Sequence, residues 1–113
     1  MIDLMHITFQ NDWSKALQEG NYRADSLLTQ GFIHCSTPAQ VAGTANRFYA
    51  GQTGLLLLGI DSKLVGAEVR WENLEGGEML FPHIYGLLNL EAVVKVIEFA
   101  PGEDGLFPAP ELE

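Results

Sequence analysis

The sequence predicts a single α+β domain whose strands form a mixed or antiparallel sheet. Short segments of alternating apolar and polar residues predominate, which is the pattern of half-buried strands. Two amphipathic helical segments occur in the first half, without the regular strand–helix alternation of a doubly wound parallel sheet. A chain of 113 residues suffices for one domain over residues 1–113. We expect a core over about residues 4–100 and a surface tail over residues 101–113.

The first part of the chain predicts a strand and a short helix. Residues 4–9 alternate between apolar and polar side chains, which predicts a strand with His6 and Thr8 on its polar face. Residues 12–19 have apolar residues at helical spacing and a glycine after them, which predicts a helix. Residues 21–30 show no such period, and we expect them to be irregular.

A second strand is predicted at residues 32–36, where alternation places His34 and Ser36 on one face. Thr37 is a natural N-cap for a second helix over residues 38–49, because the proline that follows is tolerated at the first helical position. Free N–H groups at a helix N-terminus attract anions. This stretch therefore predicts a site for an anionic or hydroxyl-rich ligand.

The remaining segments predict strands. Residues 55–60 are almost entirely apolar and lie between glycines, which indicates a strand buried on both faces. Residues 67–74 and 80–85 alternate again, and Pro82 favours an edge position or a bulge in the second of these. Residues 93–99 are rich in valine and isoleucine and predict the last strand.

Charge and composition narrow the classes of partner. Fifteen acidic residues against six lysines and arginines give a formal net charge of −9 at pH 7, which disfavours bulk nucleic acid and anionic membranes. No apolar run approaches the ~20 residues that cross a bilayer, and the first residues lack the pattern of a signal peptide. The single cysteine cannot form an internal disulfide. We therefore expect a cytoplasmic protein with a small-molecule ligand, and no particular oligomeric state is predicted.

Three histidines lie on the polar faces of three predicted strands, and each has an oxygen-bearing side chain two residues along. They are His6 with Thr8, His34 with Ser36, and His83 with Tyr85. A lone histidine in a strand is usually structural, but polar faces in a small domain must meet water or line a cleft. The recurrence on three strands therefore favours a shared cleft, with His34 and His83 as candidate catalytic groups.

Metal and thiol chemistry are weaker interpretations of the same residues. Zinc ligands commonly have short local spacings, whereas the three histidines are 28 and 49 residues apart and form no H-E-x-x-H motif. A three-histidine metal-dependent hydrolase stays an alternative, and no metal ligand is assigned. Cys35 points to the face opposite His34 in a strand, which favours a buried and inert thiol.

A few cations are candidates for binding a phosphate. Glu68, Arg70 and Glu72 form a charged strip on one strand face, which is either solvated or a wall of the cleft. In the second case Arg70 could clamp a phosphate, and Glu72 could hold a ribose hydroxyl or act as a base. Arg23, from a loop, and Arg47, from a helix, are two further candidates for binding a phosphate.

Four stretches resemble the motifs of a bacterial family of unknown function, the one numbered 952. They are Met5-His6-Ile7-Thr8, the run from Gly31 to Thr37, Arg70-Trp71-Glu72 and the run from Phe81 to Gly86. The resemblance covers about residues 4–100. The fold of this family is held to be similar to that of ADP-ribosyltransferases, so the resemblance implies a split β-sheet with a cleft for a nicotinamide dinucleotide.

More distant similarities imply the same cleft. Transferases of this fold often carry His-Gly-Thr or His-Gly-Ser on the first strand, which His6-Ile7-Thr8 resembles with isoleucine in place of glycine. The RNA 2′-phosphotransferases carry a His-Val-His-Leu-Ser strand, which residues 32–36 resemble. By this match His6 would contact the ribose or the nicotinamide, with His34 and Ser36 on the adjacent strand.

Residues and resemblance together predict a protein that binds NAD or an ADP-ribose-like nucleotide and transfers or hydrolyses at the ribose. Glu72 would stabilise the oxocarbenium ion there, with His34 and His83 as the other catalytic candidates. NAD would be a substrate, and no other cofactor is implied. A non-catalytic module that senses a nucleotide stays the alternative. The ligand-binding candidates are His6, Thr8, Arg23, Ser36, Thr37, Arg47, Arg70 and Tyr85.

Overall fold

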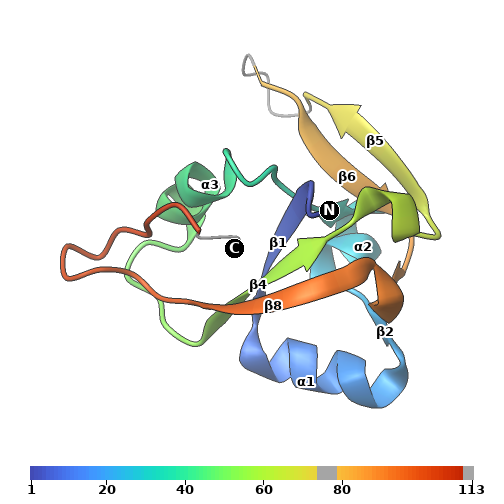
Figure 1. Cartoon of the computed structure of the whole chain (residues 1–113), viewed down its shortest axis with the longest axis horizontal. Helices are drawn as coiled ribbons and strands as arrows, with labels where there is room; N and C mark the ends of the chain where they lie inside the picture. The colour runs from blue at the N-terminus through green and yellow to red at the C-terminus, as the bar shows by residue number, and fades with distance from the viewer. Residues whose placement is uncertain (74–78, 111–113) are drawn as a thin grey trace.

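Three antiparallel sheets form the frame of the computed structural model, which describes residues 1–73 and 79–110 (Figure 1). The first sheet has the order β1 (Leu4–Phe9), β4 (Leu55–Ile60), β8 (Val93–Phe99). The second has the order β3 (Ile33–His34), β6 (Phe81–Tyr85), β5 (Glu68–Glu72). The third joins β2 (Asn21–Tyr22) to β7 (Leu88–Asn89). The prediction of an α+β domain is confirmed, and all pairing between the described strands is antiparallel.

Short helices pack around these sheets. The helices α1 (Gln10–Glu19) and α2 (Asp25–Gln30) precede β3, and α3 (Val41–Phe48) follows it. Two 3₁₀ turns, η1 (Ser62–Leu64) and η2 (Leu90–Ala92), precede β5 and β8. Figure 1 shows β5 and β6 as an arm that extends away from α1. Within the residues described, no helix has the length and apolar character needed to cross a membrane.

The first and second sheets meet where the chain leaves β3. Met5 of β1 pairs with Ser36 through two backbone hydrogen bonds of 2.7 and 2.8 Å. The two residues of β3 just before this point pair with β6 instead. A run of four residues, 33–36, therefore changes its partner from one sheet to the other, and this change joins the two sheets at a single place.

The central strand β4 lies between two hydrophobic clusters. All six of its residues are buried. Leu58 and Ile60 pack with Tyr22 on one face, whereas Leu55 and Leu57 pack on the other face with residues of α3 and β8. Since successive strand residues point to opposite faces, β4 is covered on both sides, as predicted. Full burial of each leucine contributes roughly 1.5–3 kcal/mol to the stability of the fold.

Residues 21–30 were expected to be irregular, but this prediction is wrong. They contain β2 and the additional helix α2. Gly31 ends α2 in the left-handed conformation, with φ of 87°, and its N–H donates to the carbonyls of Ser26 and Leu27. No residue of α2 is fully buried, so no apolar period marks this helix in the sequence. The described chain therefore has three α-helices where two were predicted.

The other two helices begin at different residues from those predicted. α1 begins at Gln10 rather than at residue 12, and no side chain caps it. α3 begins at Val41 rather than at residue 38. Thr37 Oγ1 accepts from the Gln40 N–H at 3.2 Å, and Gln40 Oε1 accepts from the Thr37 N–H at 3.0 Å. This reciprocal capping closes a turn ahead of the helix, so Thr37 caps the turn and not α3 itself.

β6 is the central strand of the second sheet, although Pro82 favoured an edge or a bulge. The Cys35 N–H donates to the Pro82 carbonyl at 3.0 Å. The reciprocal bond cannot form because proline has no N–H, and β3 accordingly ends at His34. Pro82 is tolerated in a central strand because the pairing it would interrupt stops there. The residues after His34 are then available to pair with β1.

The tail after residue 100 is not wholly a surface segment. Phe107 is 4% exposed, and its ring stacks on Phe99 of β8 with centroids 4.6 Å apart. The Asn46 amide donates to the Phe107 carbonyl at 3.2 Å and accepts from its N–H at 2.6 Å. The expected surface tail is therefore corrected at residue 107. Residue 74 of a predicted strand and residues 111–113 of the tail lie outside the described residues.

Truncation of the buried tail residue tests this packing. Phe107→Ala is expected to lower the free energy of unfolding by about 3 kcal/mol, because it leaves a void beside Phe99. Leu106→Ala is the matched control, since Leu106 is 49% exposed and its truncation should change stability by less than about 0.5 kcal/mol. Urea denaturation measures both variants, and equal effects would contradict the packing of the tail on β8.

Candidate functional site

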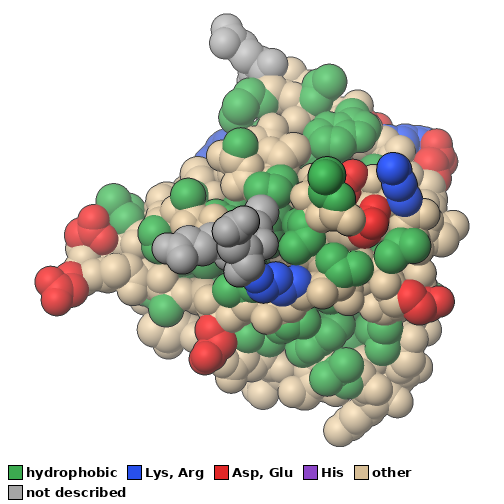
Figure 2. Space-filling model, in the orientation of Figure 1, with side chains coloured by type: hydrophobic (Ala, Val, Ile, Leu, Met, Phe, Trp, Pro, Cys, Tyr) green, Lys and Arg blue, Asp and Glu red, His purple; other side chains and the backbone are tan. Residues whose placement is uncertain are grey.

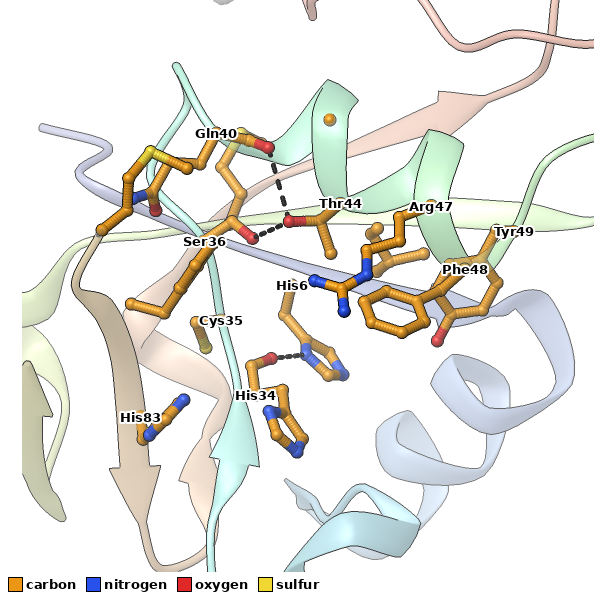
Figure 3. A pocket seen from close by; sticks show the side chains of 15 residues that line it. His6, His34, Cys35, Ser36, Gln40, Thr44, Arg47, Phe48, Tyr49 and His83 are labelled. Atoms are coloured by element: carbon orange, nitrogen blue, oxygen red, sulfur yellow. Dashed lines mark hydrogen bonds between the residues drawn. The ribbon is translucent and has the colours of Figure 1, made fainter. Parts of the chain in front are cut away.

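A cavity of about 600 Å³ lies between α3, β1 and the stretch that leaves β3 (Figure 3). Its volume is usual for a small-molecule site. His6, His34 and His83 all line it, so the polar faces of three strands meet there. The remaining lining residues come from β1, residues 35–49 and the beginning of β6; they are Met5, Ile7, Cys35, Ser36, Gln40, Gly43, Thr44, Arg47, Phe48, Tyr49, Met79 and Phe81.

His6 is held in the wall of the cavity through both of its ring nitrogens. Nδ1 lies 2.5 Å from the His34 carbonyl oxygen, and Nε2 lies 2.8 Å from the Tyr22 hydroxyl, which also bonds to Thr8 at 2.9 Å. Burial lowers the pKa of His6 to about 4. Because a carbonyl can only accept, the neutral ring carries its proton on Nδ1. His6 is therefore a neutral and fixed part of the wall. Thr8 contacts it indirectly, through the Tyr22 hydroxyl.

His83 is paired with a carboxylate. Its Nδ1 lies 2.9 Å from Glu72 Oε1, and the Tyr85 hydroxyl donates to the same oxygen at 2.6 Å. The hydrogen bonds from Tyr85 and then from His83 lower the pKa of the Glu72 carboxyl. Glu72, like an ordinary glutamate, is ionised at neutral pH, and these hydrogen bonds favour that charged form further. It does not line the cavity itself but contacts His83, which does.

Phe32 packs the histidine wall together, and sequence reasoning did not single it out. Its ring stacks on His83 with centroids 4.3 Å apart, and it meets the His34 ring edge-on at 4.7 Å. Phe32 is also 5.2 Å from the Tyr85 ring. The signal was available, because strand alternation places Phe32 on the same face as His34.

His34 lies at the exposed rim of the cavity. Its Nε2 is 2.5 Å from Gln30 Oε1 at the end of α2, and its ring meets that of His83 at a centroid distance of 5.2 Å. The helix that sequence reasoning missed thus supplies the partner of a predicted catalytic residue. His34 and His83 are neighbours because they are directly paired across β3 and β6.

Ser36 and Thr44 join the stretch after β3 to α3. Ser36 is buried, and its Oγ lies 3.1 Å from Thr44 Oγ1 (Figure 3). Gln40 lines the same end of the cavity, and neither it nor Thr44 was identified from the sequence. Gln40 and Thr44 are four residues apart, so a helix over this stretch places them on one face. That spacing could have identified them from the sequence. Thr37 does not line the cavity, because its side chain closes the preceding turn.

Arg47 is the one lysine or arginine that lines the cavity in the part of the chain described. Its guanidinium carbon lies 4.9 Å from the centroid of the Phe48 ring. Figure 3 shows both side chains reaching from α3 over His6. Arg47 is therefore placed at the cavity wall, and its phosphate-binding role stays a prediction.

Arg23 and Arg70 lie away from this cavity. Arg23 lines a separate polar hollow together with residues of α1, Lys15 among them. Arg70 is paired with Glu68 at 3.0 Å and lies over the Tyr85 ring at 4.3 Å. On the face shown in Figure 2, lysine and arginine side chains form no broad basic patch. Two of the three arginines proposed from the sequence are thus not brought to the site.

The histidines and the cysteine do not form a metal or thiol centre. Among residues 1–73 and 79–110, no group of three His, Cys, Asp or Glu side chains is placed to hold a metal ion. His6 uses both ring nitrogens and His83 uses Nδ1 within the protein. Cys35 is buried, and burial raises the pKa of its thiol, so the thiol stays protonated and unreactive.

Removal of the Tyr22 hydroxyl tests the support of His6. Tyr22→Phe is expected to lower the free energy of unfolding by about 1–3 kcal/mol, because buried groups on His6 and Thr8 lose their partner. Tyr49→Phe is the control, since Tyr49 lines the same cavity but takes no part in the hydrogen bonds of His6 and Thr8. Urea denaturation compares the two, and a neutral Tyr22→Phe would contradict the network.

Stability is expected to fall as the pH drops from about 6.5 to about 4, because of His6. Unfolded His6 binds a proton near pH 6.5, whereas the folded ring binds it only near pH 4, so protons favour the unfolded state between these values. The slope from this residue approaches about 1.4 kcal/mol per pH unit. Denaturation of His6→Gln at several pH values should show that this part of the slope is lost; an unchanged slope would refute the assignment.

Comparison with known proteins places the chain in a family. The model of a family described as "Protein of unknown function (DUF952)" matches residues 7–96. The crystal structure of protein CC0527 from Caulobacter crescentus is similar with a TM-score of 0.83 at 29% identity, covering 93% of this chain and 92% of that one. The solution NMR structure of CC0527 gives a TM-score of 0.81 at 30% identity, with coverage of 94% and 91%. No curated protein matches the chain. Because the family model spans most of its residues, the chain belongs to the DUF952 family.

Proposed function

We propose that the cavity binds a nucleotide-like ligand of the NAD or ADP-ribose class, and that the protein hydrolyses or transfers the ribosyl group beside the nicotinamide. One observation carries this proposal: three histidines, one arginine and several aromatic side chains converge on a cavity of about 600 Å³. Small-molecule sites combine apolar walls with a few polar groups in this way. The resemblance of His6-Ile7-Thr8 to the first strand of ADP-ribosyltransferases supports the same ligand class.

The parts of a nucleotide have matching groups in the cavity. Arg47 supplies the positive charge and the donors that a pyrophosphate needs. Phe48 and Phe81 offer rings on which a base can stack. The Ser36 and Thr44 hydroxyls are suited to hydrogen bonds with a ribose. In a protein of net charge −9, recognition of an anion depends on the local placement of Arg47 rather than on the overall field.

The reacting end of the ligand is expected at the histidine wall. Nicotinamide leaves as a neutral pyridine and needs little acid assistance, whereas the ribosyl group that remains gains positive charge and is stabilised by nearby negative charge. Glu72 is an ionised carboxylate behind this wall, 2.9 Å from His83. It would therefore act on the ribose through His83, in place of the direct contact that the sequence suggested.

Calorimetric titration tests the ligand class. NAD and ADP-ribose are expected to bind, and Arg47→Gln should weaken both by about tenfold or more, because a charge-assisted contact to phosphate is lost. Nicotinamide has no phosphate, so its affinity should not depend on Arg47. Arg23→Gln is the matched control, since Arg23 lies in the separate hollow.

Two outcomes would contradict parts of the proposal. Absence of binding by every nucleotide, or equal effects of Arg47→Gln and Arg23→Gln, would exclude this ligand class from the cavity. Release of nicotinamide from NAD tests the reaction separately. Tight binding without any release would contradict catalysis and would identify the protein as a nucleotide-sensing module.

A further inference from the structure

We infer that His83 is the proton acceptor of the cavity and that Glu72 is its positioning residue. The inference rests on the proposed function, which it deepens by assigning the reacting nitrogen. Nε2 of His83 would take a proton from water or from a hydroxyl group bound against the histidine wall. The assignment can be tested on the free protein, because it concerns the state of the ring before a ligand arrives.

The contact with Glu72 decides which nitrogen of His83 is available. Nδ1 lies 2.9 Å from Glu72 Oε1. An ionised carboxylate only accepts hydrogen bonds, so the neutral ring carries its proton on Nδ1. Nε2 then has a free lone pair. Within the described residues, Nε2 has no hydrogen-bond partner, and the His83 ring that carries it lines the cavity.

Packing holds the ring in this orientation. Phe32 stacks on it with an interplanar angle of 23°, and the His34 ring contacts it from the neighbouring strand. His83 is 4% exposed, so the ring has little room to turn over. The Tyr85 hydroxyl holds the same Glu72 oxygen at 2.6 Å. Ring and carboxylate are thus fixed together, which is the preorganisation that proton transfer requires.

The ring nitrogens of the other two histidines have different contacts. His6 donates Nδ1–H to the His34 carbonyl, and its Nε2 lies against the Tyr22 hydroxyl, so neither nitrogen faces a ligand unpartnered. Nε2 of His34 is 2.5 Å from Gln30 Oε1, a neutral amide oxygen that stabilises an imidazolium less than a carboxylate does. His83 instead has the Glu72 carboxylate at its Nδ1, 2.9 Å away.

The hydrolysis of NAD shows what His83 would do. The oxygen of a water molecule forms a bond to C1′ of the nicotinamide ribose, and the C1′–N bond breaks with its electron pair on the pyridine nitrogen. Nicotinamide leaves uncharged, and the proton lost by the water passes to His83 Nε2. The imidazolium is stabilised by the Glu72 carboxylate until the proton returns to solvent. If the hydroxyl of an acceptor molecule takes the place of water, the same steps transfer the ribosyl group to that acceptor.

Nitrogen-15 NMR of the labelled protein tests the assignment directly. Long-range proton–nitrogen correlations distinguish a protonated from a bare ring nitrogen. In neutral His83 the proton is expected on Nδ1, with Nε2 bare. A proton on Nε2 in the wild-type protein would overturn the inference. Because this measurement needs no substitution, it holds even if a variant fails to fold.

Reaction with diethyl pyrocarbonate, which acylates a bare imidazole nitrogen, tests the role of Glu72. The rate at His83, followed by peptide mass spectrometry, should fall about tenfold in Glu72→Gln, since a charge-assisted hydrogen bond is replaced by a neutral one. Glu68→Gln is the matched control, because Glu68 lies on the same strand and face but contacts Arg70 instead. Equal rates in wild type and Glu72→Gln, or an equal loss in Glu68→Gln, would overturn the positioning role.

These results separate the inference from the proposed function. If His83 has a bare, Glu72-dependent Nε2 but no nucleotide binds, the proton acceptor stands and the ligand class is wrong. If NAD binds through Arg47 but the His83 proton is on Nε2, the ligand class stands and the proton acceptor is wrong.

Discussion

The structure depends on one short stretch, residues 33–36, which pairs with two sheets in succession. Ile33 and His34 pair with β6, and Ser36 pairs with Met5 of β1. The first pairing ends because Pro82 has no N–H to donate to the chain beside it. The crossing that follows brings the His34 carbonyl to His6 and leaves the side chains of both sheets facing one cavity. A proline in a central strand therefore helps to create the site.

Two histidines on equivalent strand faces have different chemistry because their surroundings differ. His6 is enclosed between the His34 carbonyl and Tyr22, and burial keeps it neutral. His83 is as deeply buried, but a carboxylate lies at its Nδ1. Burial without a charged partner penalises the imidazolium of His6, whereas Glu72 fixes the orientation of the His83 ring through Nδ1. The cavity wall thus combines a histidine held by neutral groups with one held by a carboxylate.

The predicted strands agree best with the structure where the strand is marked by a pattern of neighbouring residues in the sequence. β1, β4 and β8 have the bounds expected from alternation and from continuous apolar character. α2 was missed because none of its residues is fully buried, so it has no apolar stripe. The burial of Phe107 was missed because it depends on Asn46, 61 residues away along the chain. Neither a short exposed helix nor a distant packing contact leaves a periodic signal.

From the sequence alone it follows which side chains share a strand face, and hence that His6, His34 and His83 belong to polar faces. Only the tertiary structure shows that these faces meet at one cavity, that Arg47 lines it while Arg23 and Arg70 do not, and that Glu72 contacts His83 rather than the cavity. The reason is physical. The direction of a side chain follows from the local period of two residues in a strand, whereas partner, register and burial are set by contacts between residues far apart in the chain.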